Sequence, residues 1–94
     1  MKLRWTERAV EHLQSAHDYL EAENPGAAWD TVDRIMSAVE RLERFPHMGR
    51  IGRVEGSREL VVTGTPFVVA YRVKAESVQI LAVLHAARKW PGTF

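Results

Sequence analysis

The sequence has no cysteine and no long hydrophobic run. Without cysteine, the 94-residue chain can form neither a disulfide nor a thiolate metal site. Its apolar stretches fall short of the roughly 20 residues that a membrane-spanning helix needs, and its N-terminus lacks the apolar core of a signal peptide. No repeat or low-complexity tract is present. These absences predict a cytoplasmic protein, with no membrane partner, that folds as one domain over residues 1–94.

A large net charge is also missing, because 13 basic and 12 acidic side chains nearly cancel. The two halves of the chain nevertheless differ. Residues 1–43 carry 5 basic and 9 acidic side chains, whereas residues 44–94 carry 8 basic and 3 acidic ones, so the net charges are −4 and +5. The second half is therefore predicted to be the part that attracts anions.

Three runs rich in Val, Leu, Phe and Tyr dominate the second half of the chain. Short segments with Gly, Pro or Ser separate them, which is typical of consecutive antiparallel strands. We expect strands at residues 57–63, 67–74 and 78–85, and an added strand at residues 2–5. The run from Val78 to Leu84 is almost entirely apolar, which predicts a central strand covered on both faces.

Two amphipathic stretches precede these strands. The first has apolar residues four, three and four positions apart and predicts a helix over residues 7–22. The second predicts a helix over residues 25–44, which Asn24 caps and Pro25 begins. The tight connection favours an antiparallel helical hairpin. Packing this hairpin on the sheet gives an α+β fold of order βααβββ, in which residues 46–56 form the main loop.

Seven short motifs occur in a fixed order over nearly the whole chain. They are Trp5-Thr6 followed by Ala9, Asn24-Pro25 with Ala27-Ala28, Phe45-Pro46 with Met48-Gly49-Arg50, Gly56-Ser57-Arg58-Glu59-Leu60-Val61, Thr65-Pro66-Phe67, Ala70-Tyr71-Arg72-Val73, and Val83-Leu84-His85 with Arg88 and Trp90-Pro91. The ordered set resembles the RelE/ParE family of bacterial toxins from type II toxin–antitoxin systems. The resemblance implies a small toxin that arrests growth.

The resemblance also implies a partner and two possible targets. The partner is a small antitoxin encoded beside the toxin, and the target is either ribosome-bound mRNA or DNA gyrase. Because the sheet half is basic, we expect an acidic antitoxin that folds on binding and forms a hetero-oligomer with the toxin. Cleavage of mRNA is narrowly favoured. The alternatives are gyrase inhibition without nuclease activity and a degenerate toxin that only binds its antitoxin.

Arg58, His85 and Arg88 are the candidate catalytic residues for RNA cleavage. Metal-independent cleavage needs a base, an acid and cations for the phosphate in transfer, and a histidine at a strand end can move protons near neutral pH. We expect these three side chains to cluster where the chain leaves the last strand. The candidate nucleic-acid-binding residues are Arg50, Arg53, Arg72 and Lys89.

Other positions depart from the nuclease pattern of the family. Val68 stands where the RNA-cleaving relatives have an arginine, and residues 90–94 replace a terminal tyrosine or His-Tyr pair. These departures favour the gyrase-directed alternative. No metal or cofactor is expected, since His12 and His17 lie five positions apart on a helix, which is poor spacing for a shared metal ion.

Overall fold

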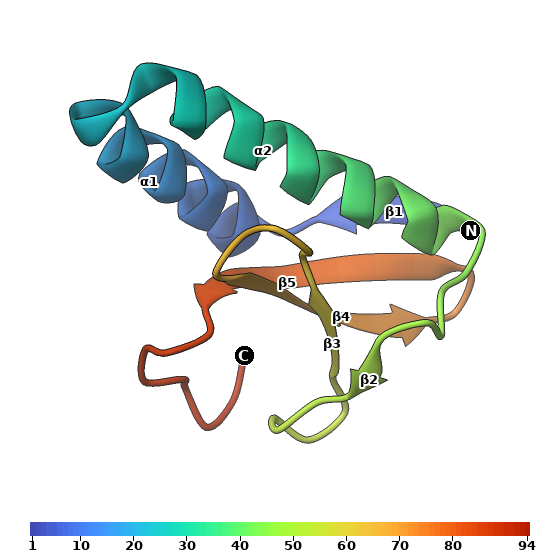
Figure 1. Ribbon diagram of the computed structural model, residues 1–94. Coiled ribbons are helices and arrows are strands. Elements are labelled where there is room, and N and C mark those ends of the chain that lie inside the picture. Colours follow the sequence, from blue (N-terminus) through green and yellow to red (C-terminus); the bar gives the residue numbers. More distant parts are fainter.

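The computed structural model describes residues 1–94 as two helices on one face of a five-stranded sheet (Figure 1). The elements are β1 Lys2–Trp5, α1 Glu7–Glu23, α2 Pro25–Glu40, a 3-10 turn Arg41–Glu43, β2 Arg50–Ile51, β3 Arg58–Val61, β4 Phe67–Lys74 and β5 Ser77–His85. The strand order is β1-β5-β4-β3-β2, with β1 parallel to β5 and the other pairs antiparallel. The α+β fold is confirmed.

Both helices begin at a side chain that caps them, and Asn24 is the cap expected for the second. Thr6 Oγ1 accepts a hydrogen bond from the Ala9 N–H at 3.2 Å, and Asn24 Oδ1 accepts one from the Ala27 N–H at 3.2 Å. Pro25 occupies the first turn of α2, where its missing N–H costs nothing. The helices therefore reverse direction within one residue and lie side by side above the sheet (Figure 1). Neither helix is long and apolar enough to cross a membrane.

Three predicted boundaries were wrong. The α-helical part of α2 ends at Glu40 rather than at residue 44, because a tighter 3-10 turn replaces the last α-helical turn ahead of Phe45-Pro46. Residues 46–56 are not loop throughout, since Arg50 and Ile51 form β2 against β3. A strand of two residues is too short to show an alternating pattern in the sequence. Strand β3 covers 58–61 instead of 57–63, because a turn through Gly64 at φ 82° begins early.

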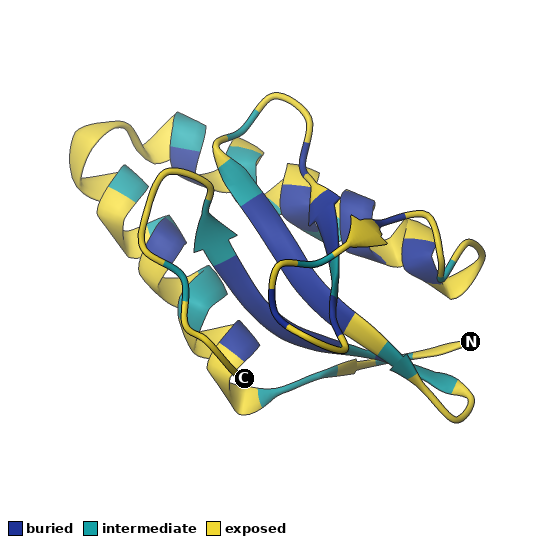
Figure 2. Cartoon of the chain, turned by 90° about the horizontal axis from the view of Figure 1, so that it is seen from below, coloured by how far each residue is buried: buried dark blue, intermediate teal, exposed yellow.

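Strand β5 is an interior strand, although β4 rather than β5 is the centre of the sheet. It pairs with β1 on one side and with β4 on the other. Its buried side chains join those of β4 and α2 in one hydrophobic core, and Figure 2 shows the buried residues as a continuous band along both strands. The largest fully buried side chains of the protein are those of Tyr71, Ile35, Leu42, Ile80, Val39, Val62, Val68, Val69 and Val78.

Tyr71 is a fully buried tyrosine that anchors the segment before β2. Its hydroxyl oxygen accepts a hydrogen bond from the Gly49 N–H at 2.9 Å, and burial raises the pKa of Tyr71 above its ordinary value, so the hydroxyl stays neutral. The backbone at Gly49 lies close to both Tyr71 and β3. A Cβ on Gly49 would lie 2.6 Å from that hydroxyl and 2.9 Å from the carbonyl oxygen of Glu59. Only glycine fits here without displacing the sheet.

We expect Gly49→Ala to lower the free energy of unfolding by about 1–3 kcal/mol, because the added methyl group overpacks a fully buried site. Urea denaturation measures the change. Gly92→Ala is the matched control, since nothing lies within 4 Å of its added Cβ, and it also reports the effect of the exchange on the unfolded chain. Equal midpoints for the two variants would contradict the expectation.

Candidate functional site

A cleft of about 480 Å³ opens between α1 and the end of β5. Its walls come from α1, from the turn that joins β3 to β4, and from the end of β5 with the segment behind it. Six of its twelve lining residues are hydrophobic and none is acidic. The polar lining residues are His12, Ser15, Tyr19, His85, Arg88 and Lys89. The cleft therefore suits a ligand that combines apolar groups with negative charge.

The cleft exists because β1 covers only part of the outer edge of β5. The parallel register ends with Trp5 opposite Ile80. Thr6 Oγ1 then donates a hydrogen bond to the Ile80 carbonyl at 2.7 Å, and α1 begins. Farther along β5, the Val83 N–H donates to Nδ1 of His12 on α1 at 3.2 Å. The imidazole of His12 thus accepts the hydrogen bond that a backbone carbonyl of a neighbouring strand would otherwise have accepted.

His12 is held neutral in this position. Burial lowers the pKa of His12 most, the positive charge of Arg8 lowers it further, and Glu11 opposes both effects. Nδ1 needs its lone pair to accept the hydrogen bond from Val83, so the bond and the low pKa agree. His12 is therefore part of the cleft wall and not one of its positive charges.

His85 lies in the cleft, at the end of β5, and organises the segment behind it. Its Nδ1 accepts a hydrogen bond from the Ala87 N–H at 3.1 Å, and its carbonyl accepts from the Arg88 N–H at 3.1 Å and from Trp90 Nε1 at 3.4 Å. Its ring packs edge-on against Phe67, with 5.8 Å between centroids. Nε2 is the ring nitrogen left to exchange a proton with a ligand.

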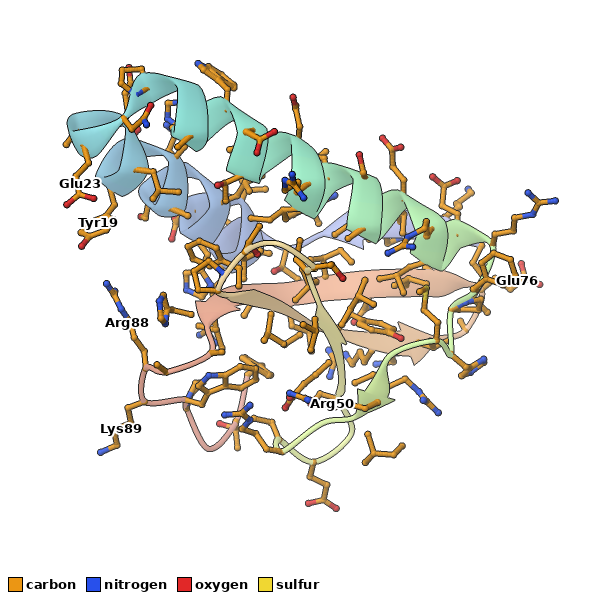
Figure 3. The ribbon with its side chains drawn as sticks, in the orientation of Figure 1. Tyr19, Glu23, Arg50, Glu76, Arg88 and Lys89 are labelled. Atoms are coloured by element: carbon orange, nitrogen blue, oxygen red, sulfur yellow. The ribbon has the colours of Figure 1, made fainter.

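Arg88 and Lys89 supply the positive charge of the cleft. Both side chains are exposed and neither forms a salt bridge. The guanidinium carbon of Arg88 lies 6.0 Å from the centre of the Tyr19 ring, and Figure 3 shows Arg88 below Tyr19 at the end of the molecule opposite to Glu76. His85 and Arg88, two of the three residues expected to cluster, thus lie in one cleft, and Lys89 lies there with them.

Arg58 does not join His85, and this part of the predicted cluster is wrong. Arg58 faces Tyr71 across the β3–β4 ladder, whereas His85 faces Phe67 across the β4–β5 ladder. Phe67 and Tyr71 are four positions apart on β4, which is about 13 Å along the strand. Local sequence does not determine which residues of β3 and β4 are paired, so the distance between Arg58 and His85 could not be predicted.

The Arg58 side chain is occupied by the backbone. Its Nη1 donates to the carbonyl oxygen of Gly49 at 2.8 Å and to that of His47 at 3.3 Å. Together with the Tyr71 hydroxyl, it holds the chain between α2 and β2 against the sheet. Arg58 therefore has a structural role in this arrangement.

Glu59 is a buried carboxylate that Arg50 and Arg53 neutralise. Its side chain is 2% exposed. It accepts hydrogen bonds from Arg50 Nη2 at 2.9 Å, from Arg53 Nε at 3.1 Å and from the Arg53 N–H at 2.8 Å. Burial by itself would raise the pKa of Glu59, but the bonds from Arg53 and Arg50 outweigh it and place the pKa below its ordinary value. Two predicted nucleic-acid-binding residues are therefore paired with a carboxylate of the protein itself, although about half of each side chain stays exposed.

Residues 86–94 form a tail that runs back beneath the sheet, on the face opposite to the helices (Figure 1). The guanidinium carbon of Arg53 lies 3.7 Å from the centre of the Trp90 ring. Residues 92–94 line a hollow together with Leu81 and Arg72. Arg53 thus contacts both Glu59 and Trp90, and it connects the segment after β2 to the tail.

Tyr19 and Glu59 were missed in the sequence. Tyr19 lies three positions after Ala16 and one before Leu20, at the border of the apolar stripe of α1, so its place beside β5 depends on the tertiary packing. Glu59 could have been found from its neighbours, because it is the one carboxylate in the strand predicted at residues 57–63, close to Arg50, Arg53 and Arg58. A single acid in a predicted strand beside three arginines favours a buried ion pair.

His17, Asp18 and Glu21 offer three potential ligand atoms within 4.8 Å of one another on α1. His17 Nδ1 lies 3.2 Å from Asp18 Oδ1 and 3.4 Å from Glu21 Oε2. The two carboxylates are more than half exposed, and His17 and Glu21 stand four positions apart, the spacing at which side chains of a helix face each other. Ordinary side-chain contacts on one helix account for this trio.

The comparisons with known proteins agree with the fold and the motif order. Residues 3–90 match the family described as "ParE toxin of type II toxin-antitoxin system, parDE". The protein Y4kP of Sinorhizobium fredii is 41% identical over 90 residues, which cover 96% of this chain and 93% of that protein. The Toxin RelE2 of Caulobacter vibrioides is 37% identical over 84 residues, which cover 89% of this chain and 93% of that protein.

A solved structure shares the arrangement of the elements. It is described as the chromosomal ParDE TA system from P. aeruginosa, and one of its chains superposes with a TM-score of 0.81 at 31% sequence identity, covering 88% of this chain and 92% of that one. A toxin of such a system has an antitoxin as its partner. This chain therefore belongs to the RelE/ParE family, as a ParE-type toxin of a type II toxin–antitoxin system.

Proposed function

We propose that this toxin arrests growth by binding and inhibiting DNA gyrase, without cleaving RNA. The supporting observation is the dispersal of its arginines. Arg58 is tied to backbone carbonyls, and Arg50 and Arg53 are tied to Glu59. His85 is therefore left with Arg88 and Lys89 as its cations, without the further arginines that would help to stabilise a phosphate in transfer. Inhibition by binding needs no such constellation.

Cleavage of mRNA is the second candidate function, and His85 is the observation that favours it. Its free Nε2 lies in the same cleft as Arg88 and Lys89, so one proton-transfer group and two cations are present. The cation expected from β3 is missing from this group. A nuclease built on these residues alone would have to obtain its remaining groups from the ribosome.

Two assays with the purified toxin separate these functions. We expect the toxin to inhibit DNA supercoiling by gyrase and to leave mRNA intact on translating ribosomes. His85→Ala should retain gyrase inhibition within a few fold, because no proton is transferred. The opposite result would be mRNA cleavage that His85→Ala slows by about 100-fold or more, which is typical of a lost acid or base. That result would establish the nuclease and refute the gyrase proposal.

The antitoxin is proposed to place an acidic, partly apolar segment in the cleft between α1 and β5. Apolar side chains such as Leu20, Phe67 and Leu84 offer a surface to bury, while Arg88 and Lys89 lie beside them without acidic partners of their own. A segment that is disordered when free would order its backbone against this cleft. The cleft would then hold the toxin in a hetero-oligomer.

A further inference from the structure

The sheet carries a second group of free cations, at the end away from the cleft. Lys2 and Arg4 lie on β1, and Arg72 and Lys74 lie on β4. We call these four residues the basic corner. In sequence they form two unrelated pairs about 70 positions apart. The strand register brings them together on one face.

The pairing of the strands fixes this face. Leu3 and Trp5 pack into the core under the helices, so Lys2 and Arg4 alternate to the opposite face. The register aligns Arg4 with Gln79 and Gln79 with Arg72, and it aligns Lys2 with Ser77 and Ser77 with Lys74. Arg72 Nε donates to Gln79 Oε1 at 2.7 Å, which places both side chains on the same face.

The basic corner is therefore a rectangle of four positive charges around two neutral polar residues. Its rows lie about 7 Å apart along the strands, and its columns lie two strand spacings, or about 10 Å, apart. All four side chains are exposed and none forms a salt bridge. Lys2, Arg4 and Lys74 border a broad hollow of about 1020 Å³ whose one acidic lining residue is Glu76, and Arg72 is connected to it through Gln79.

The composition of the corner indicates its ligand. Protein interfaces centre on apolar or aromatic anchors, and single-stranded nucleic acids are held by aromatic rings that stack on bases. The hollow has no aromatic lining residue, and its two hydrophobic residues are Met1 and Ala75. Interfaces with duplex DNA are strongly positive and polar, and they rely on contacts to phosphates. A duplex also carries one negative charge per about 1.7 Å of its axis, so several phosphates fit over a surface of this size.

We propose that the basic corner binds the phosphate backbone of duplex DNA, without reading its sequence. This property goes beyond gyrase inhibition and antitoxin binding. It uses residues that are separate from the cleft, and Arg72 is the single member that the sequence had identified as a nucleic-acid contact. DNA bound at the corner would lie on the face of the sheet opposite to the helices, beside the tail, while the cleft at the other end stays free.

Fluorescence anisotropy with a labelled 20-base-pair duplex of random sequence tests the proposal on the purified toxin. Neutralising four phosphates predicts a slope of log affinity against log salt of about −3.6, or a loss of about 100-fold between 50 and 200 mM salt. Lys2→Gln with Lys74→Gln should reduce the magnitude of the slope by about half. Glu76→Gln should raise the affinity. Circular dichroism checks that each variant is folded.

Arg41→Gln with Arg44→Gln is the matched control, because both side chains are exposed, lie outside the corner and change the net charge equally. We expect it to bind DNA within about twofold of the parent. If both double variants weaken DNA binding equally, the affinity depends on net charge alone, and the proposal is overturned. Tighter binding of single-stranded RNA, of duplex RNA or of poly-glutamate would also overturn it, as would no binding at 50 mM salt. The assay contains no gyrase, so a failure here leaves the proposed inhibition untouched.

Discussion

Replacing Arg88 and Lys89 together by glutamate should weaken binding of the antitoxin by about 100-fold or more. The two side chains are the free positive charges of a cleft that has no acidic lining residue. Coupling energies of close charge pairs across an interface are about 1.5–7 kcal/mol, so reversing two of them turns a substantial attraction into repulsion. The variant should lose affinity for the antitoxin while it remains folded, because both side chains are exposed.

Isothermal titration calorimetry with the purified antitoxin measures this loss. Arg41→Glu with Arg44→Glu is the matched control, since it makes the same change in net charge away from the cleft. Its affinity should stay within a few fold of the parent, and the affinity of the parent should fall as salt rises. If the cleft variant binds as tightly as the control variant, the antitoxin does not use Arg88 and Lys89.

Glu59→Gln should lower the free energy of unfolding at pH 7 by about 2–3 kcal/mol. The carboxylate is buried and accepts hydrogen bonds from Arg50 and Arg53, and bonds to charged groups contribute about 1.5–3 kcal/mol each. A neutral amide keeps the shape but loses the charge that the two guanidinium groups require. Those groups are about half exposed and regain water, so the loss stays below the cost of a fully buried unpaired charge.

The difference between the parent and Glu59→Gln should depend on pH. The folded-state pKa of Glu59 lies below the ordinary value of 4.5, so its contribution to stability is complete above that value. It is lost as the pH falls through the lower folded-state pKa, where the carboxylate becomes protonated. Urea denaturation from pH 7 to pH 2 should therefore show the two stabilities converge in acid. Glu55→Gln, at an exposed position, is the control and should change stability by less than about 0.5 kcal/mol.

Loss of the Glu59 carboxylate also tests how the tail is held. Arg53 contacts both Glu59 and Trp90, so freeing its guanidinium from the carboxylate should loosen the tail as well. The intrinsic fluorescence of Trp90 adds a local signal to the global unfolding curve, although Trp5 and Trp29 contribute to it. Substituting Trp5 and Trp29 by phenylalanine in both proteins would isolate that signal.

The secondary structure followed closely from local sequence. Thr6 and Asn24 fixed the starts of both helices because their side chains satisfy backbone N–H groups within three residues. The apolar runs predicted β4 and β5 to within one residue at each end. The two-residue strand β2 could not be predicted, since it exists only through its partners on β3.

The sequence by itself determined the order of the elements, the family motifs and the placement of His85 with Arg88 and Lys89, which follow one another within five residues. Only the tertiary structure decided the rest. Strand register separates Arg58 from His85. Packing pairs Arg50 and Arg53 with Glu59. The register also places Lys2 and Arg4 near Arg72 and Lys74. The physical reason is that the side chains of a strand alternate between two faces, so a pairing that local sequence does not specify decides which charges meet.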